Sequence, residues 1–104
     1  MSAPERGEVW LVDLGMAAKV RPCLVLSIPV LDTERALATS VTHTTSVRRT
    51  RFEVSVSAPF LRAGAFDTQN VITVPYAKYI RKLGKLSATQ LQAVENAVRL
   101  WLAF

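Results

Sequence analysis

The side chains best suited to phosphate chemistry fall into two short segments of this 104-residue chain. Arg21 comes directly before a proline, with Lys19 two residues earlier, and the run 43–51, HTTSVRRTR, joins hydroxyl groups to cations. Arginine suits two-point contact with a phosphate, and Thr and Ser hydroxyls can donate to the remaining phosphate oxygens. Such a set could stabilise the five-coordinate transition state of a phosphodiester. A solvated basic surface loop is the simpler alternative.

Familiar nucleophilic and metal-binding motifs are absent from the sequence. There is no G-x-S-x-G, no Walker loop and no H-E-x-x-H. The chain has one histidine, His43, which excludes a mechanism with two histidines. Its eight Asp and Glu residues form no D-x-D or comparable pair, so the sequence disfavours a two-metal nuclease. The one cysteine, Cys23, lies in the apolar run CLVL and is interpreted as a buried strand residue rather than a reactive thiol.

Composition indicates a small basic domain. Thirteen Lys and Arg against eight Asp and Glu give a formal net charge of +5, which favours polyanionic partners. Charge alone is equally consistent with a basic protein that has no role in nucleic-acid binding. Half of the residues are apolar or aromatic, so residues 1–104 are expected to form a single domain with a modest core.

The N-terminus has no apolar signal core, and no stretch approaches the roughly 18 apolar residues of a membrane span, which predicts a cytoplasmic protein without a membrane segment.

Hydrophobic periodicity predicts five strands joined by short connections. Residues 8–14 alternate, with Trp10, Val12 and Leu14 on one face. Residues 22–28 form an almost continuous apolar run, which is typical of a strand covered on both faces. The remaining expected elements are strands at 36–42, 51–57 and near 68–74, a polar basic loop at 43–50, and a short extended piece or turn at 79–85.

The chain is predicted to end in a helix whose start is well marked. Ser87 and Gln90 form an S-x-x-Q capping box, and Leu86 with Leu91 fits a hydrophobic staple. The apolar face that covers the sheet is expected to contain Leu91, Val94, Val98 and Trp101. The elements together predict an α+β, mainly β fold, in which a strongly bent antiparallel sheet closes towards a small barrel.

Five segments form an ordered set of motifs along the chain. They are RGEVWLVDL (6–14), RPCLVLS (21–27), VTHTTSVRRTRFEV (41–54), GAFDTQNVITV (64–74) and LGKLSATQLQAVENAVRLWL (83–102). In this order they resemble the MazF/PemK family of toxins from type II toxin–antitoxin systems. The resemblance covers almost the whole chain, and the ordered set is more specific than any single motif.

The resemblance implies a compact SH3-like barrel, of the MazF/PemK/CcdB type, with about five to seven short antiparallel strands and a C-terminal helix. It implies a homodimer that acts as an mRNA interferase, an endoribonuclease that cleaves single-stranded mRNA at specific sequences. The ribose 2′-OH would be the nucleophile, with no metal and no cofactor. A cognate antitoxin protein is the other implied partner, and growth inhibition the implied effect.

The resemblance also implies which residues react. The family's catalytic Arg, directly before a Pro, matches Arg21, and its catalytic Thr, at the end of the third strand, matches Thr44; a register shift of one would select Thr45. Because an Arg pKa above about 12 makes a plain general acid awkward, Arg21 is expected to clamp the phosphate and stabilise charge, and Thr44 to donate to the scissile phosphate. The candidate RNA-binding residues are Lys19, Ser46, Arg48, Arg49, Arg51 and Gln69.

The loop before Arg21 departs from the family pattern. In the family this loop is usually longer and carries an acidic residue, whereas GMAAKVR at 15–21 is short and has none. A general-base role for that acidic group therefore has no counterpart here. His43, with an unperturbed pKa near about 6.5, could take the role. A pairing or RNA-stacking role for His43 is equally open.

Two other functions stay open on the sequence. A CcdB-like DNA gyrase poison shares the fold, but such toxins end in Trp-Gly-Ile, whereas this chain ends RLWLAF and Trp101 is expected on the core face of the helix. A non-catalytic RNA-binding barrel, or a degenerate toxin, is kept open by the missing acidic residue. An RNA-cleavage assay with and without EDTA separates the three functions.

Overall fold

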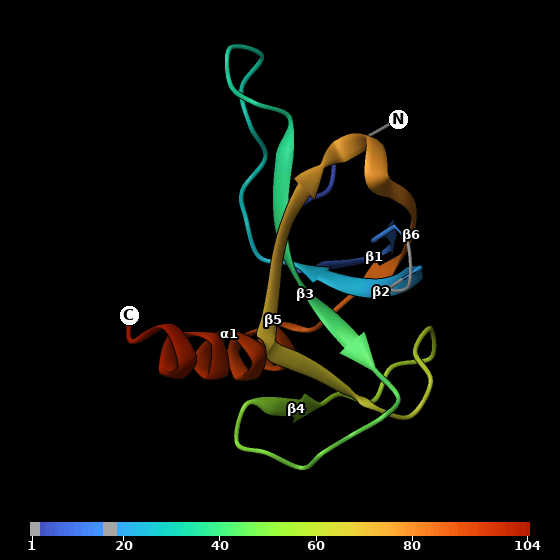
Figure 1. Ribbon diagram of the computed structural model, residues 1–104, viewed down its shortest axis with the longest axis vertical. Coiled ribbons are helices and arrows are strands. Elements are labelled where there is room, and N and C mark those ends of the chain that lie inside the picture. The colour runs from blue at the N-terminus through green and yellow to red at the C-terminus, as the bar shows by residue number, and fades with distance from the viewer. Residues whose placement is uncertain (1–2, 16–18) are drawn as a thin grey trace.

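A bent sheet with one α-helix packed against it makes up the fold (Figure 1). The computed structural model describes residues 3–15 and 19–104. The strands are β1 (Glu8–Asp13), β2 (Val20–Val25), β3 (Leu37–Thr44), β4 (Glu53–Ser55), β5 (Ala65–Pro75) and β6 (Tyr79–Lys85). A 3₁₀ turn, η2 (Tyr76–Lys78), joins β5 to β6, and helix α1 (Ala88–Leu102) follows β6. Within the described ranges no helix is long and apolar enough to cross a membrane.

All strand neighbours in the sheet are antiparallel, in the order β4-β5-β3-β2-β1-β6. The mainly β, α+β fold with a C-terminal helix is therefore confirmed. In the described part of the chain β4 and β6 lie at the two ends of this order, so the sheet bends like a barrel without closing. A register shift in the β3–β5 pairing falls between Val41 and Thr42. Such a shift bends a sheet, and Figure 1 shows β5 turning sharply where it passes α1.

Both faces of the central strands are buried, which creates two hydrophobic clusters. The first contains Val9, Leu24, Val41, Val56, Phe66, Leu86, Val94 and Val98. The second contains Trp10, Val12, Cys23, Val25, Ala38 and Tyr79, with Leu14 packed against it. Successive residues of β1 and β2 alternate between the clusters, as strand geometry requires. The prediction that residues 22–28 form a strand covered on both faces is confirmed for residues 23–25, but β2 ends at Val25 and Ile28 is 74% exposed. The shared face of Trp10, Val12 and Leu14 is confirmed.

Cys23 and Glu8 are two of the ionisable residues buried in the sheet. Cys23 has no exposed surface, and burial raises the pKa of its thiol to about 12, which confirms an unreactive strand cysteine. Glu8 accepts a hydrogen bond from Nε1 of Trp10 at 2.9 Å and pairs with Nζ of Lys82 at 2.9 Å. Burial raises the pKa of Glu8, but the hydrogen bonds from Trp10 and Lys82 outweigh burial and hold that pKa below its usual value. The ion pair ties β1 to β6.

Helix α1 begins as its sequence predicts. The Ser87 hydroxyl accepts from the backbone N–H of Gln90 at 3.1 Å, and Oε1 of Gln90 accepts from the backbone N–H of Ser87 at 3.0 Å. The capping box is therefore confirmed. Leu86 and Leu91 both belong to the first cluster, as a hydrophobic staple requires.

The end of α1 is less buried than predicted. Trp101 keeps 44% of its surface exposed, and its ring meets the Phe52 ring edge-to-face with 5.3 Å between centroids. The prediction that Trp101 lies on the core face is wrong. Val98 is the last helical member of the first cluster, so the final turn of α1 extends past the buried part of the sheet.

Two strand boundaries differ from prediction in ways that move functional candidates. β2 begins at Val20, so Arg21 lies inside a strand. β3 continues to Thr44, so His43 and Thr44 belong to a strand and not to the polar loop. The loop prediction failed here because THT is polar, although its residues continue the pairing of β3 with β5.

The other differences concern the strands that flank the helix. β4 is shorter than the predicted 51–57, because the Glu53 carboxylate accepts backbone N–H groups from Arg48 and Thr50 and holds the preceding residues in a loop. β5 begins at Ala65 rather than near 68, and residues 79–85 form the full strand β6 rather than a short piece.

Candidate active site

Arg21 lies near the start of β2, beside the end of the neighbouring antiparallel strand β3. It is the second residue of β2, and its side chain is exposed. The last residues paired between the two strands are Cys23 and Thr42. If the antiparallel register is extended by two residues on each strand, Arg21 falls opposite Thr44. The two residues that the resemblance predicts to be catalytic therefore lie near the same end of these two strands.

A hollow of about 510 Å³ opens at this end of β2 and β3, and we call it the Arg21 hollow. Besides apolar residues of β1, β2 and β6, its lining residues are Arg21, His43, Thr45, Phe60, Arg62 and Arg81. The lining contains three arginines and no carboxylate. The field inside the hollow therefore favours an anion such as a phosphate.

The two candidate threonines differ in position. Thr45 lines the Arg21 hollow and is exposed. Thr44 is half-buried, and its Oγ1 accepts the backbone N–H of Ser46 at 3.0 Å. Thr44 therefore falls opposite Arg21 in the extended strand register, whereas Thr45 lines the hollow.

His43 is buried beside the hollow. Only 3% of its surface is exposed, although it contributes to the lining. Its ring meets Phe66 edge-to-face with 5.1 Å between centroids, and its Nε2 has no hydrogen-bond partner among the described residues. Burial lowers the pKa of His43 below its usual value, so the imidazole is neutral near pH 7. A neutral imidazole with an unpaired nitrogen can accept a proton or a hydrogen bond.

Gly64 holds the β4–β5 connection against the end of β3. A Cβ at Gly64 would overlap the carbonyl oxygen of Thr44 and would lie 2.8 Å from Cε1 of His43. A larger residue therefore cannot fit without moving the backbone of β3 or this connection. The position of the connection relative to Thr44 and His43 is fixed by this close approach.

A second hollow, of about 890 Å³, adjoins the first, and we call it the Arg49 hollow. Its lining includes Val47, Arg49 and the segments 55–58 and 61–64. Thr45 and Arg62 line both hollows. The two hollows therefore adjoin, and we call them together the groove. Its lining mixes apolar side chains with hydroxyl groups and arginines and contains no carboxylate.

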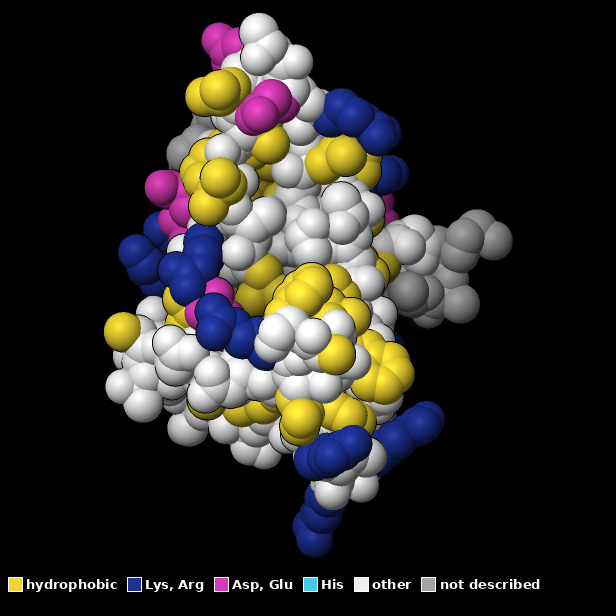
Figure 2. Space-filling view, turned by 90° about the vertical axis from the view of Figure 1, so that its left-hand side faces the viewer, with side chains coloured by type: hydrophobic (Ala, Val, Ile, Leu, Met, Phe, Trp, Pro, Cys, Tyr) yellow, Lys and Arg dark blue, Asp and Glu magenta, His cyan; other side chains and the backbone are white. Residues whose placement is uncertain are grey.

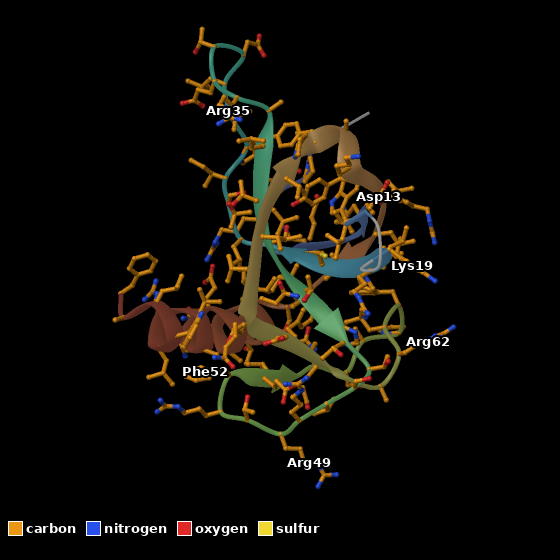
Figure 3. All side chains as sticks on the ribbon, viewed as in Figure 1. Asp13, Lys19, Arg35, Arg49, Phe52 and Arg62 are labelled. Atoms are coloured by element: carbon orange, nitrogen blue, oxygen red, sulfur yellow. The ribbon has the colours of Figure 1, made fainter. Side chains whose placement is uncertain are left out.

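The structure brings together some predicted site residues and leaves others apart. Arg21, His43, Thr45 and Arg49 line the groove. The residues outside its lining are Lys19, Thr44, Ser46, Arg48, Arg51 and Gln69. Figure 3 shows Lys19 on the same side of the molecule as Arg62, while the guanidinium of Arg51 lies over the Phe52 ring at 4.7 Å from its centroid. Residues 16–18 of the short loop before Arg21 lie outside the described residues.

Sequence reasoning missed Phe60, Arg62 and Arg81, which line the Arg21 hollow. The segment 59–64, PFLRAG, lies outside every predicted strand, although it contains a cation between apolar residues and a glycine. Residues 79–85, YIRKLGK, do not alternate between apolar and polar types, so no local signal marks Arg81 as a strand residue. No cluster of three or more metal-binding side chains occurs in the residues that the structure describes.

Solved structures similar to this chain share its fold over nearly their full lengths. An endoribonuclease from a mycobacterial species, in complex with its cognate antitoxin, is 24% identical with a TM-score of 0.84, covering 98% of this chain and 97% of that one. A MazE–MazF structure from Deinococcus radiodurans is 19% identical with a TM-score of 0.84, covering 100% and 99%. The Mycobacterium tuberculosis toxin MazF-mt6 is 27% identical with a TM-score of 0.79, covering 93% and 97%.

The family match covers the same length of chain. The family described as "PemK-like, MazF-like toxin of type II toxin-antitoxin system" matches residues 5–102. This range contains every strand, the helix and the whole groove. The protein therefore belongs to the PemK-like, MazF-like toxins of type II toxin–antitoxin systems.

Proposed function

We propose that this toxin is an endoribonuclease that cleaves single-stranded mRNA at specific sequences without a metal or a cofactor. The observation that carries the proposal is the Arg21 hollow, in which Arg21, His43 and Thr45 gather in a lining that contains no carboxylate. The family match, and the endoribonuclease activity named for a relative of the same fold, support this activity. Residues 1–104 act as one toxin domain.

In the proposed reaction the ribose 2′-oxygen attacks the neighbouring phosphorus. The 2′-OH loses its proton, an O–P bond forms, and the bond from phosphorus to the next nucleotide's 5′-oxygen breaks as that oxygen takes up a proton. The products are a 2′,3′-cyclic phosphate, or its hydrolysed form, and a 5′-OH. The Arg21 guanidinium offsets the charge that builds on the phosphate oxygens, a contribution of about 10²–10³ in rate for one well-placed donor.

One of two neighbouring threonines, Thr44 or Thr45, donates to the scissile phosphate. Thr45 faces the hollow directly. The Thr44 hydroxyl accepts from Ser46, so its own O–H remains able to donate. Replacing each threonine by Ala separates their contributions, because only the residue that donates to the scissile phosphate lowers the cleavage rate at saturating RNA.

His43 is the proposed proton acceptor for the 2′-OH. Its unpaired Nε2 and its neutral imidazole fit this role. Because Nε2 is buried, the imidazole must turn towards the Arg21 hollow when RNA binds. Hydrogen bonds of catalytic groups commonly reach their final geometry only with substrate in place.

The same proposal includes a symmetric homodimer, a cognate antitoxin and action in the cytoplasm. Figure 2 shows hydrophobic side chains bordered by Lys and Arg on the face where α1 ends. The large apolar residues exposed there are Leu100, Trp101, Leu102 and Phe104. Exposed apolar side chains of this kind mark protein interfaces. An antitoxin segment rich in carboxylates would cover the cationic groove and block RNA.

A cleavage assay tests the proposed function. The protein is incubated with a long mRNA in EDTA, and the fragment ends are mapped. We expect cleavage at defined sequences, with cyclic phosphate or its opened form at one end and 5′-OH at the other. Strict dependence on added magnesium, or 5′-phosphate ends, would contradict the mechanism.

The family match favours this function over a gyrase poison. The exposure of Trp101 removes one of the sequence arguments against that alternative, so the argument now rests on the family and the groove. RNA binding without cleavage in the same assay would favour the non-catalytic barrel.

A further inference from the structure

Arg62 lies between the two hollows, and the proposed reaction does not use it. It lines the Arg21 hollow and the Arg49 hollow, a position that it shares with Thr45. Its side chain is exposed. Among the described residues it forms no ion pair, and no hydrogen bond of its side chain is present. The guanidinium is therefore available to an anion in the groove.

The connection that carries Arg62 is anchored on both sides of it. Phe60 and Leu61 pack against the first hydrophobic cluster, and the Phe60 ring lies so close to Gly84 that a Cβ there would overlap it. On the other side, Gly64 fits against the end of β3. Arg62 thus projects from a backbone whose position is set by the core, which reduces the ordering entropy that binding has to overcome.

The Arg49 hollow has the chemistry of a nucleotide site. Apolar side chains such as Val47 and Leu61 lie beside the hydroxyls of Ser55 and Ser57. Nucleobases pack against apolar side chains, stack on arginine planes and form hydrogen bonds with polar groups. Figure 3 shows Arg62 and Arg49 projecting in different directions, so cations border this hollow on two sides.

We propose that Arg62 binds the phosphate next to the scissile phosphate, and that the Arg49 hollow holds the nucleotide beyond it. RNA would then cross from the Arg21 hollow to the Arg49 hollow over Thr45 and Arg62. This inference rests on the proposed ribonuclease function and adds a second substrate contact to it. Arg62 positions the RNA and takes no part in proton transfer.

The test compares Arg62→Ala and Arg62→Gln with Arg35→Ala. Arg35 is an exposed arginine that Figure 3 shows at the opposite end of the molecule, so its loss changes net charge equally. The probe is a short RNA that carries the mapped cleavage site with a 2′-deoxy sugar at the cleaved nucleotide, which prevents cleavage. We expect both Arg62 variants to bind about tenfold more weakly and to flatten the slope of log affinity against log salt by about 0.7. Arg35→Ala should change neither quantity.

A second readout locates the contact. Single phosphates of the probe are replaced in turn by neutral methylphosphonates. Wild-type protein should lose affinity when the phosphate next to the scissile one is neutralised, whereas Arg62→Ala should lose nothing further at that position. With cleavable RNA, Arg62→Ala should raise KM and leave kcat unchanged.

The outcomes separate this inference from the function on which it rests. If the wild type cleaves RNA in EDTA but both Arg62 variants match Arg35→Ala, the Arg62 contact is wrong and the ribonuclease stands. If the wild type neither binds nor cleaves RNA, both proposals fail. Melting curves show whether each variant is folded, and Arg62→Gln, which keeps most of the side chain's length, answers the question if Arg62→Ala does not fold.

Discussion

The groove and the exposed end of α1 are both surfaces suited to a partner, but they are built differently. The groove combines arginines and hydroxyl groups with apolar side chains, and Gly64 packs tightly against the end of β3 beside it. The end of α1 presents apolar side chains, of which Phe104 is 89% exposed. A smaller hollow of about 370 Å³ lies between this end and the sheet and is lined by Leu26, Val71 and Leu102 among others.

The difference indicates what each surface requires of its residues. Hydrogen bonds to a phosphate depend on distance and angle, so the groove needs a fixed backbone. Apolar association depends mainly on buried area, so the helix end needs only exposed side chains. Substitutions in the groove should therefore act through geometry and charge, and substitutions at the helix end through the area that an interface loses.

Gly64→Ala tests the fixed geometry of the groove and has the largest expected effect on stability. The added Cβ overlaps the Thr44 carbonyl and contacts His43, and forced contacts in a packed site typically cost about 1–3 kcal/mol. We expect the melting temperature to fall by roughly 4–20 °C, together with the cleavage rate of the folded fraction. Ala36→Ser, at an exposed position outside the lining of the groove, is the control. Equal stability of both variants would show that the connection adjusts easily.

Leu102→Ala tests the helix end. In a two-fold interface the substitution acts twice, and a loss of about 1 kcal/mol per copy weakens dimerisation roughly 30-fold. Analytical ultracentrifugation over a concentration series measures this change. Leu31→Ala, at a 69% exposed residue away from α1, is the matched control. A wild type that stays monomeric at micromolar concentration, or a Leu102→Ala dimer as tight as wild type, would remove α1 from the interface.

The buried imidazole of His43 predicts a pH dependence of stability. Burial lowers the pKa of His43 in the folded protein, so between that pKa and the unfolded value near 6.5 the unfolded chain binds more protons. Stability is therefore fully present above about pH 6.5 and is lost as pH falls. The pKa of Glu8 is lowered from 4.5, so its stabilising contribution is constant near neutral pH and is lost only as pH falls below about 4.5.

His43→Gln provides the comparison. We expect the melting temperature of the wild type to drop between pH 7.5 and 5.5, and that of His43→Gln to drop less. Identical curves for the two proteins would mean that His43 becomes protonated without cost in the folded state.

Arg48 and Arg49 are adjacent in sequence but differ in position, and they provide the smallest and most specific test. Only Arg49 lines a hollow. For a single-stranded RNA, Arg49→Ala should flatten the salt dependence of binding by about 0.7 in the logarithmic slope. Arg48→Ala should leave the slope unchanged. Equal effects of both variants would indicate a diffuse basic loop rather than a defined groove.

The fold was largely predictable because it depends on local patterns. Period-2 alternation marks β1, and the S-x-x-Q box marks the first turn of α1. The site was less predictable because it depends on where strands stop. His43 was assigned to a polar loop, yet its pairing with Phe66 in β5 buries it. Nothing in the local sequence shows that a strand will continue through polar residues.

The sequence also could not predict which residues, far apart along the chain, meet in the groove. Arg62 and Arg81 reach the Arg21 hollow from a connection and from the last strand. Their approach depends on two close backbone contacts, at Gly64 and Gly84, which only the folded chain brings about. Residue types could identify Arg21 as a candidate, but not the arginines that share its hollow.

Arg21→Ala tests the central claim, that the groove is a catalytic site, most directly. The single-turnover cleavage rate and the affinity for an uncleavable RNA are measured in EDTA on one preparation of each protein. We predict that the rate falls by about 10²–10³, while affinity falls far less because Arg49, Arg62 and Arg81 remain in the groove. The melting temperature should stay near that of the wild type, since Arg21 pairs with neither Glu8 nor Asp13. An unchanged rate in the folded protein would contradict the account.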